Sequence, residues 1–186
     1  MSEILMGFKK RGLTIFLTGL SAAGKTSIAE ALCEEITKTT NRYVTVLDGD
    51  AIRNNLSSGL GFSKKDRDTN VLRTGFVATE ITKHGGIVIC AMISPYNKSR
   101  EAVREMVTRY GDFIEIYVST PLQVCEQRDP KGLYAKARQG VIKNFTGIDD
   151  PYEAPKNPEI QINTSVLNIN ETINMIMNFL INNNYI

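Results

Sequence analysis

The sequence contains no tryptophan, three cysteines and a single histidine among its 186 residues. A metal site built from several histidines therefore cannot form within one chain. Catalysis by a histidine base would depend on His84 alone. That residue stands in Lys83-His84-Gly85, a pattern that predicts a helix end followed by a glycine cap. We expect His84 to have no chemical role.

The sequence also lacks an excess of one charge and any long apolar run. Its 22 basic and 20 acidic side chains leave a net charge of +2, so we expect no nucleic-acid partner, although a local cationic pocket stays compatible with this balance. Apolar runs such as residues 87–93 fall short of the ~20 residues that cross a bilayer, and residues 1–6 are too short for a signal-peptide core. We expect no membrane partner. Cys33, Cys90 and Cys125 are odd in number and lack metal-ligand spacing, which favours the reducing cytoplasm.

Short apolar or β-branched runs alternate with longer helical patterns along the chain. The runs are nearly continuous, as in strands buried on both faces of a parallel sheet. The expected strands are residues 13–18, 43–47, 87–92, 113–118 and 160–163. The expected helices are residues 25–39, 64–84, 97–110, 121–127 and 171–182. This order predicts one α/β domain over residues 1–186, with a doubly wound, mostly parallel five-stranded sheet and flanking helices.

One long segment, residues 129–158, interrupts this alternation. It contains four prolines and three glycines and shows little apolar periodicity. A loop of that length within a compact domain is usually functional, often as a lid over a site.

The segment between the first expected strand and the first expected helix matches the phosphate-loop pattern G-x-x-x-x-G-K-[ST] in full. The expected ATP-binding residues are Gly19, Leu20, Ser21, Ala22, Ala23, Gly24, Lys25, Thr26 and Ser27. In such a loop, backbone N–H groups and the helix N-terminus surround the phosphates. Lys25 adds a charge on the transferring phosphoryl group, and the Thr26 hydroxyl ligates Mg²⁺. The nearest candidate for a guanine-reading segment, residues 97–100, lacks the aspartate, so a small kinase is favoured over a GTPase.

Two carboxylates, Asp48 and Asp50, follow the second expected strand and should face the same crevice as the phosphate loop. They suit Mg²⁺ or its waters, and one suits proton acceptance from an acceptor hydroxyl. The alternative is that Asp50 caps a helix after a turn at Gly49.

Arginines on both sides of a glycine-containing loop suggest a site for an anionic acceptor. Arg53 and Arg67 offer forked guanidinium contacts. Arg67, Asn70 and Arg73 are spaced three residues apart on an expected helix and share a broad face. The alternative is a solvated charged helix face.

Taken together, these motifs resemble the adenylyl-sulfate kinase (APS kinase) family of P-loop kinases from Gly12 to about Glu159. The matching blocks are the phosphate loop, residues 47–50 with Arg53, residues 60–63, Arg67 with Asn70, residues 93–96, 128–134 and 145–153. The resemblance implies the reaction ATP + adenylyl sulfate → ADP + 3′-phosphoadenylyl sulfate (PAPS) in sulfate assimilation. Two alternatives stay open: a kinase of another nucleotide-linked anion, and a non-catalytic nucleotide-binding subunit of a sulfate-activating complex.

The resemblance also implies individual roles. Asp50 would orient or deprotonate the ribose 3′-hydroxyl, Asp48 would place the magnesium, and Arg128 would lie near the ATP adenine. The implied substrate-binding residues are Asp50, Arg53, Phe62, Arg67, Asn70, Ile93, Ser94, Lys131, Phe145, Gly147 and Ile148. Phe62 and Phe145 would sandwich the acceptor adenine, and residues 128–152 would form the lid. Ser94 would either form a phosphoserine intermediate or line the pocket during direct transfer.

The resemblance further implies a homodimer and allows functional coupling to an ATP sulfurylase. The sequence departs from the family pattern at Ala22, where glycine is usual, and at Leu72, Asn97 and Ser99. If position 22 needs a positive φ angle, the phosphate loop is mildly strained.

Overall fold

The computed structural model describes residues 11–186; residues 1–10, including the residues 1–6 considered above, lie outside it. Within this range the chain alternates strands and helices. The strands are β1 (Leu13–Thr18), β2 (Val44–Asp48), β3 (Ile87–Ala91), β4 (Asp112–Val118) and β5 (Ile160–Ile162). The helices are α1 (Lys25–Thr40), α2 (Gly49–Asn54), α3 (Lys64–Lys83), α4 (Asn97–Thr108), α5 (Leu122–Arg128), α6 (Leu133–Arg138) and α7 (Ile169–Asn182).

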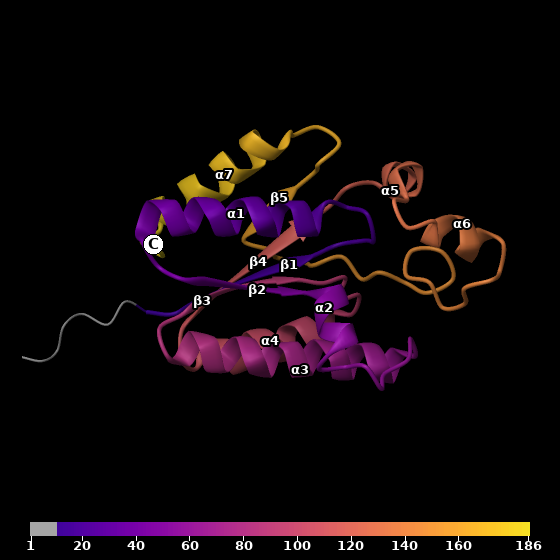
Figure 1. Cartoon of the computed structure of the whole chain (residues 1–186), viewed down its shortest axis with the longest axis horizontal. Helices are drawn as coiled ribbons and strands as arrows, with labels where there is room; N and C mark the ends of the chain where they lie inside the picture. The colour runs from indigo at the N-terminus through magenta and orange to yellow at the C-terminus, as the bar shows by residue number, and fades with distance from the viewer. Residues whose placement is uncertain (1–10) are drawn as a thin grey trace, which may run out of the picture.

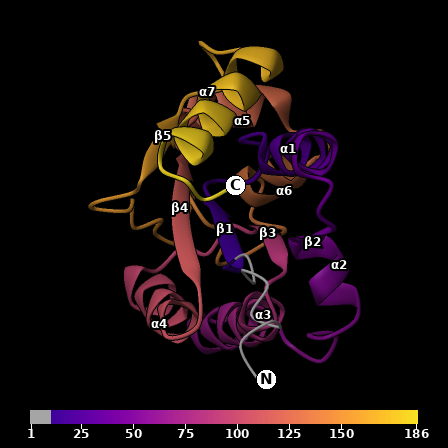
Figure 2. The same cartoon turned by 90° about the vertical axis from the view of Figure 1, so that its left-hand side faces the viewer.

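The five strands form one sheet in the order β2-β3-β1-β4-β5, with every neighbouring pair parallel. Helices α1 and α7 cover one face and α3 and α4 cover the other, while α5 and α6 lie beyond one end of the strands (Figures 1 and 2). All six residues of the central strand β1 are buried, because it has a neighbour on each side and helices on both faces. The expected doubly wound α/β fold is confirmed.

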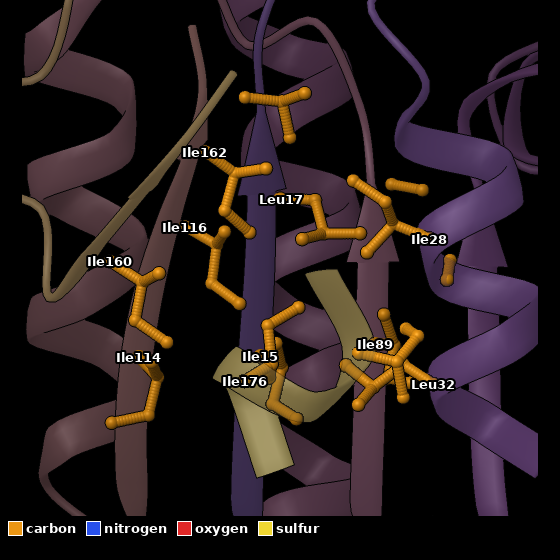
Figure 3. Packing of buried hydrophobic residues seen from close by; sticks show 14 of the residues in the cluster. Ile15, Leu17, Ile28, Leu32, Ile89, Ile114, Ile116, Ile160, Ile162 and Ile176 are labelled. Carbon is orange, nitrogen blue, oxygen red and sulfur yellow. The ribbon is translucent and has the colours of Figure 1, made fainter. Parts of the chain in front are cut away.

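The sheet has a separate apolar layer on each face. On one face, Ile15 and Leu17 of β1 pack with Ile28 and Leu32 of α1 and with Ile176 of α7 (Figure 3). All five side chains are at most 1% exposed. Truncating one of them, as in Leu32→Ala, should cost about 2–5 kcal/mol through lost burial and the cavity left behind.

The opposite face of the sheet packs against α3 and α4. There Phe16 of β1 lies 5.6 Å from Phe113 of β4, measured between ring centroids. Val88 of β3 and Val103 of α4 complete the contact. The two layers fix the sheet rigidly, so that the loops at its carboxyl edge start from defined positions.

Two short helices, α2 and α6, were not expected from the sequence. Each depends on one aspartate: the Asp48 carboxylate accepts a hydrogen bond from the Asp50 N–H at 2.9 Å, and the Asp129 carboxylate accepts from the N–H groups of residues 133–135. The cap of α2 is therefore Asp48, and the alternative that Asp50 caps this helix is wrong. The segment 129–158 is irregular except for α6.

Other boundaries agree closely with expectation. Tyr43 is 96% exposed and lies outside β2, which instead runs on to Asp48. His84 is the C-cap of α3 and is followed by Gly85 with φ of 82°, as the helix-end pattern predicted. No helix among residues 11–186 is long and apolar enough to span a membrane.

Candidate functional site

A cavity of about 660 Å³ opens at the carboxyl edge of the sheet, between the phosphate loop, α2, α3 and the segment that follows α5. Its volume lies in the range of small-molecule sites. The sequence-predicted residues that line it are Ser21, Ala22, Gly24, Lys25, Thr26, Ser27, Asp48, Asp50, Arg53, Phe62, Arg67, Asn70, Ile93, Ser94, Arg128 and Lys131. Residues from five separate parts of the chain thus meet around one space.

The phosphate loop holds three residues with positive φ angles, Gly19, Ala22 and Gly24. Gly19 has φ of 154°, and a Cβ there would lie 2.5 Å from the Val118 carbonyl oxygen. Ala22 has φ of 57°, a left-handed conformation that costs a non-glycine residue about 1–2 kcal/mol. The mild strain expected at Ala22 is therefore present.

Two threonines that the sequence analysis missed hold this loop from behind. The Thr120 and Thr164 hydroxyls both donate to the Ala23 carbonyl oxygen, at 3.1 and 2.9 Å. Arg128 donates to Thr164 as well, at 2.7 Å to Oγ1, so it lies beside the loop. Both threonines stand just after a strand, β4 or β5. That position was the available signal, because loops at this edge carry function.

Lys25 lies inside the loop rather than reaching out of it. Its side-chain amine donates to the carbonyl oxygens of Gly19 and Leu20, at 2.9 and 2.6 Å, and the residue is 8% exposed. Burial lowers the pKa of Lys25 to about 8, against the opposing effect of nearby acidic groups including Asp48 and Asp50. The N-cap of α1 is Gly24, which supplies no side-chain cap, so the first N–H groups of α1 are free for a phosphate.

Thr26 and Asp48 form a pair of oxygen ligands next to Lys25. The Thr26 hydroxyl donates to Oδ2 of Asp48 at 2.9 Å. Hydroxyl and carboxylate oxygens are the ligand types that Mg²⁺ prefers, and this ion usually keeps several waters and phosphate oxygens besides. No cluster of three His, Cys, Asp or Glu ligands occurs within residues 11–186. The donor set therefore fits a magnesium that arrives with a nucleotide.

Asp50 lines the cavity and is paired with Lys131, in the segment that follows α5. Its carboxylate forms a hydrogen-bonded ion pair with Lys131, and both side chains are more than half exposed. The contact joins α2 to the loop between α5 and α6, across the opening.

Two guanidinium groups lie close to the Phe62 ring on the cavity wall. The guanidinium carbons of Arg53 and Arg67 lie 4.5 and 5.7 Å from the Phe62 ring centroid. Burial, and then the charge of Arg67, lowers the pKa of Arg53. Like charges held this close favour an anion between or beside them.

Arg67 also ties two loops together. It donates to the Phe62 carbonyl oxygen at 2.9 Å, to the Thr146 hydroxyl at 2.7 Å and to the Asn144 carbonyl oxygen. Asn144 and Thr146 flank Phe145 in the chain, so one buried guanidinium contacts Phe62 and both neighbours of Phe145.

Two buried polar atoms on the cavity wall lack a partner. Oδ1 of Asn70 and Oγ of Ser94 make no hydrogen bond within the described residues, and the two side chains are 4% and 2% exposed. Leaving such an atom unsatisfied costs about 1–3 kcal/mol. Both atoms lie where a ligand could satisfy them.

Three predicted substrate residues, Phe145, Gly147 and Ile148, do not line this cavity, and their expected place in it is not observed. Phe145 packs edge-on against Tyr134, with ring centroids 5.0 Å apart. It is held there because the Asn144 and Phe145 N–H groups donate to the Asp149 carboxylate. Gly147 and Ile148 line a separate hollow beside the phosphate loop.

Arg73 also points away from the cavity. Its guanidinium donates to the Leu56 carbonyl oxygen at 3.0 Å. Of the three residues expected to share one helix face, only Arg67 and Asn70 reach the site, because the face turns away from the cavity over the next turn of α3.

Comparison with known proteins agrees with this geometry. Residues 11–163 match the sequence model of the family described as adenylylsulphate kinase. The chain belongs to the adenylylsulphate kinase family. An adenylyl-sulfate kinase of Gloeothece citriformis is 53% identical over 169 residues, which cover 91% of this chain and 94% of that protein. The resemblance drawn from the motifs is confirmed, and with it the assignment as a P-loop kinase.

Solved structures of the adenylylsulphate kinase family share this fold. The APS kinase of Mycobacterium tuberculosis, in complex with AMPPNP and APS, superposes with a TM-score of 0.87 at 42% identity, covering 91% of this chain and 98% of that one. A hexameric APS kinase from Thiobacillus denitrificans gives a TM-score of 0.75 at 42% identity, covering 96% of this chain and 30% of that longer one.

Proposed function

We propose that this protein transfers the γ-phosphoryl group of ATP to the 3′-hydroxyl of adenylyl sulfate, giving ADP and PAPS for sulfate assimilation. The observation that carries the proposal is the single cavity in which the phosphate loop, Asp50 and the Arg53–Arg67 pair face one another. The related M. tuberculosis enzyme, whose structure holds AMPPNP and APS, supports it.

On the ATP side, the phosphate loop and the N-terminus of α1 receive the β- and γ-phosphates. Lys25 leaves its two loop carbonyls to contact the transferring phosphoryl group, and Arg128 lies toward the adenine. Thr26 and Asp48 hold the magnesium, which when bound neutralises charge on the phosphates. The lining of the cavity and the lack of a side-chain cap at the N-terminus of α1 support these roles.

On the acceptor side, Asp50 orients the 3′-hydroxyl and accepts its proton. Arg53 and Arg67 bind the phosphosulfate, and Asn70 offers its unpartnered Oδ1 to a ribose or base donor. Phe62 gives one face for the adenine. Because phosphoryl transfer has a loose transition state, positioning and charge neutralisation supply most of the catalysis, and no histidine is required.

We propose that transfer is direct and that Ser94 lines the acceptor pocket. A nucleophilic serine needs a neighbouring base, whereas Oγ of Ser94 has no hydrogen-bond partner within the described residues. Turnover that largely survives in Ser94→Ala supports this role. Labelled phosphate trapped on the wild-type chain and absent from Ser94→Ala would establish the phosphoserine route instead.

We further propose that residues 128–152 act as a lid on a single domain. Lys131 lies on this segment and already contacts Asp50 across the cavity mouth, so closure would bring a cation to the phosphates and exclude water. In this proposal Phe145, Gly147 and Ile148 approach the acceptor when the lid closes over it, while the Arg67 contacts at Asn144 and Thr146 keep this segment attached to α3.

The wider setting of the enzyme is also a proposal. We propose a cytoplasmic homodimer that supplies PAPS and works alongside an ATP sulfurylase. The free state of Cys33, Cys90 and Cys125 supports a reducing compartment. Self-association in a relative, the hexameric T. denitrificans enzyme, supports an oligomer. Light scattering on the purified protein would give the oligomeric state directly.

The function is tested by ADP release with and without adenylyl sulfate. We expect release to depend on adenylyl sulfate, and we expect Asp50→Asn to lose about 10²–10⁴-fold in turnover while ATP binding persists. Asp66→Asn is a matched control. It makes the same substitution at a carboxylate that contacts Ser63 at the start of α3 and does not line the cavity. Faster turnover with a different nucleotide-linked anion would favour the alternative acceptor, and no ADP release with any acceptor would favour a non-catalytic subunit.

A further inference from the structure

The turn that carries Ser94 has an unfavourable backbone that its surroundings must maintain. Ser94 has φ of 44°, a left-handed value that rarely persists unless neighbouring groups fix it. It directly follows the carboxyl end of β3 and lines the cavity. Behind it, the Thr18 hydroxyl donates to the Ile93 carbonyl oxygen at 2.7 Å.

A buried arginine outside the cavity lining contacts both this turn and the segment that ends at Glu153. Arg100, on α4, is 3% exposed. Its Nη1 donates to the Ser94 carbonyl oxygen at 2.5 Å, and its Nη2 donates to the Glu153 carbonyl oxygen at 2.6 Å and to Oδ1 of Asn97. One planar guanidinium thus joins the turn after β3 to the end of the proposed lid.

The charge of Arg100 is balanced from the sheet. Its Nε donates to Oε1 of Glu115, on β4, at 2.9 Å. Arg104, one turn further along α4, lies 3.4 Å from the other Glu115 oxygen and 2.6 Å from Glu159. A buried charge without a partner would be strongly destabilising, so Glu115 anchors the guanidinium in one place.

Further hydrogen bonds make the turn and the lid end a single unit. The Glu153 N–H donates to the Pro95 carbonyl oxygen, and the Asn97 N–H donates to the Glu153 carboxylate, both at 2.8 Å. The Tyr96 hydroxyl donates to the Asp150 carboxylate at 2.8 Å. These hydrogen bonds join residues 150–153 directly to the residues that follow Ser94 on the cavity wall.

We propose that Arg100, held by Glu115, is a positioning residue that keeps the Ser94 turn and the lid end at residues 150–153 in the arrangement that receives the acceptor. It acts through these backbone contacts and does not touch the substrate. The expected change in the KM for adenylyl sulfate rests on the proposed function. The expected change in amide exchange rests on the hydrogen bonds alone.

The test compares Arg100→Lys with Arg104→Lys. Lysine keeps the charge beside Glu115 but cannot reproduce the planar fork that reaches Ser94 and Glu153 together. We expect Arg100→Lys to raise the KM for adenylyl sulfate about tenfold or more, while the Kd for ATP changes less than about twofold. Arg104→Lys disturbs the same ionic network, but Arg104 makes its side-chain hydrogen bonds to Glu115 and Glu159, so we expect its kinetics to stay near wild type.

Amide hydrogen exchange provides a readout that is independent of turnover. We expect the N–H groups of Asn97 and Glu153 to exchange about tenfold faster or more in Arg100→Lys, and at the wild-type rate in Arg104→Lys. The proposal is overturned if Arg100→Lys leaves both exchange and acceptor KM unchanged, or if Arg104→Lys shows the same defects. If wild-type protein exchanges as expected but shows no adenylyl-sulfate turnover, the proposed function fails and the positioning contacts stand.

Discussion

We expect the buried amine of Lys25 to make ATP binding depend on pH above neutrality. Lys25 is held against two loop carbonyls, and its pKa is lowered to about 8 because burial disfavours the charged form. A bound triphosphate would favour that form and raise the pKa. As pH rises above 8, the free protein loses the proton that the complex needs, so the affinity for ATP falls.

The size of this effect follows from the fraction of Lys25 that stays protonated. With a free pKa of about 8 and a bound pKa above the tested range, the affinity should fall about 25-fold between pH 7.5 and 9.5. That change corresponds to about 2 kcal/mol of binding free energy. The terminal phosphate of ATP is ionised throughout this range, since phosphate second pKa values lie near 6.

Isothermal titration calorimetry with Mg²⁺ and ATP measures both consequences. Titrations at pH 9 in buffers of different ionisation enthalpy should show uptake of close to one proton on binding. Lys25→Met should bind ATP weakly and with an affinity that does not change with pH. Lys131→Met, which removes an exposed lysine from the same cavity, should keep the wild-type dependence on pH. If the wild-type affinity for ATP varies less than threefold between pH 7.5 and 9.5, with no proton uptake at pH 9, deprotonation of Lys25 does not control ATP binding.

The remaining predictions concern the phosphate loop, the metal and the aromatic residues. Ala22→Gly should raise the free energy of unfolding by about 1 kcal/mol, since it removes left-handed strain at the cost of some unfolded-state entropy, and thermal denaturation would show a higher Tm. Asp48→Asn keeps a residue able to cap α2 but weakens a metal ligand, so the Mg²⁺ concentration for half-maximal activity should rise about tenfold. Phe62→Ala, at a side chain 57% exposed, should leave stability within about 0.5 kcal/mol while raising the acceptor KM about tenfold. Phe145→Ala should instead cost about 2 kcal/mol in urea denaturation, because this ring packs against Tyr134.

The sequence carried enough periodicity to predict the sheet and its main helices. Runs such as residues 13–18 and 87–91 are buried on both faces, which is why their composition was continuous and apolar. The short helices α2 and α6 have no such signal, since each has six residues and its first N–H groups donate to a single aspartate, Asp48 or Asp129. Short helices are decided by local hydrogen bonds, which apolar periodicity does not reveal.

Site residues could be predicted where a sequence motif determines the backbone conformation. They could not be predicted where tertiary contacts determine the position of the side chain. The position of each motif in the chain was enough to predict that Lys25, Thr26 and Asp48 lie together, because the phosphate loop and the end of β2 meet at the same edge of the sheet. The placement of Phe145 depends on the Asp149 carboxylate and on Tyr134, contacts that no local pattern encodes.

The supporting contacts of the site were equally hidden in the sequence. Arg100 had appeared only as part of a segment that fails to read guanine, and its buried pairing with Glu115 depends on the packing of α4 against β4. Thr120 and Thr164 likewise act through a carbonyl oxygen of the phosphate loop, which becomes their neighbour only once the strands are in order.

We propose above that the γ-phosphoryl group of ATP is transferred to a ribose 3′-hydroxyl within one cavity. Phosphorus and proton NMR of the product formed from ATP and adenylyl sulfate tests it most directly, because the new phosphate couples to the proton on the carbon that bears it. We expect a single product phosphorylated at the 3′ position, formed with stoichiometric ADP and not formed at a comparable rate by Asp50→Asn. A phosphate at any other position, or adenylyl sulfate recovered unchanged after ATP has been consumed, would contradict it.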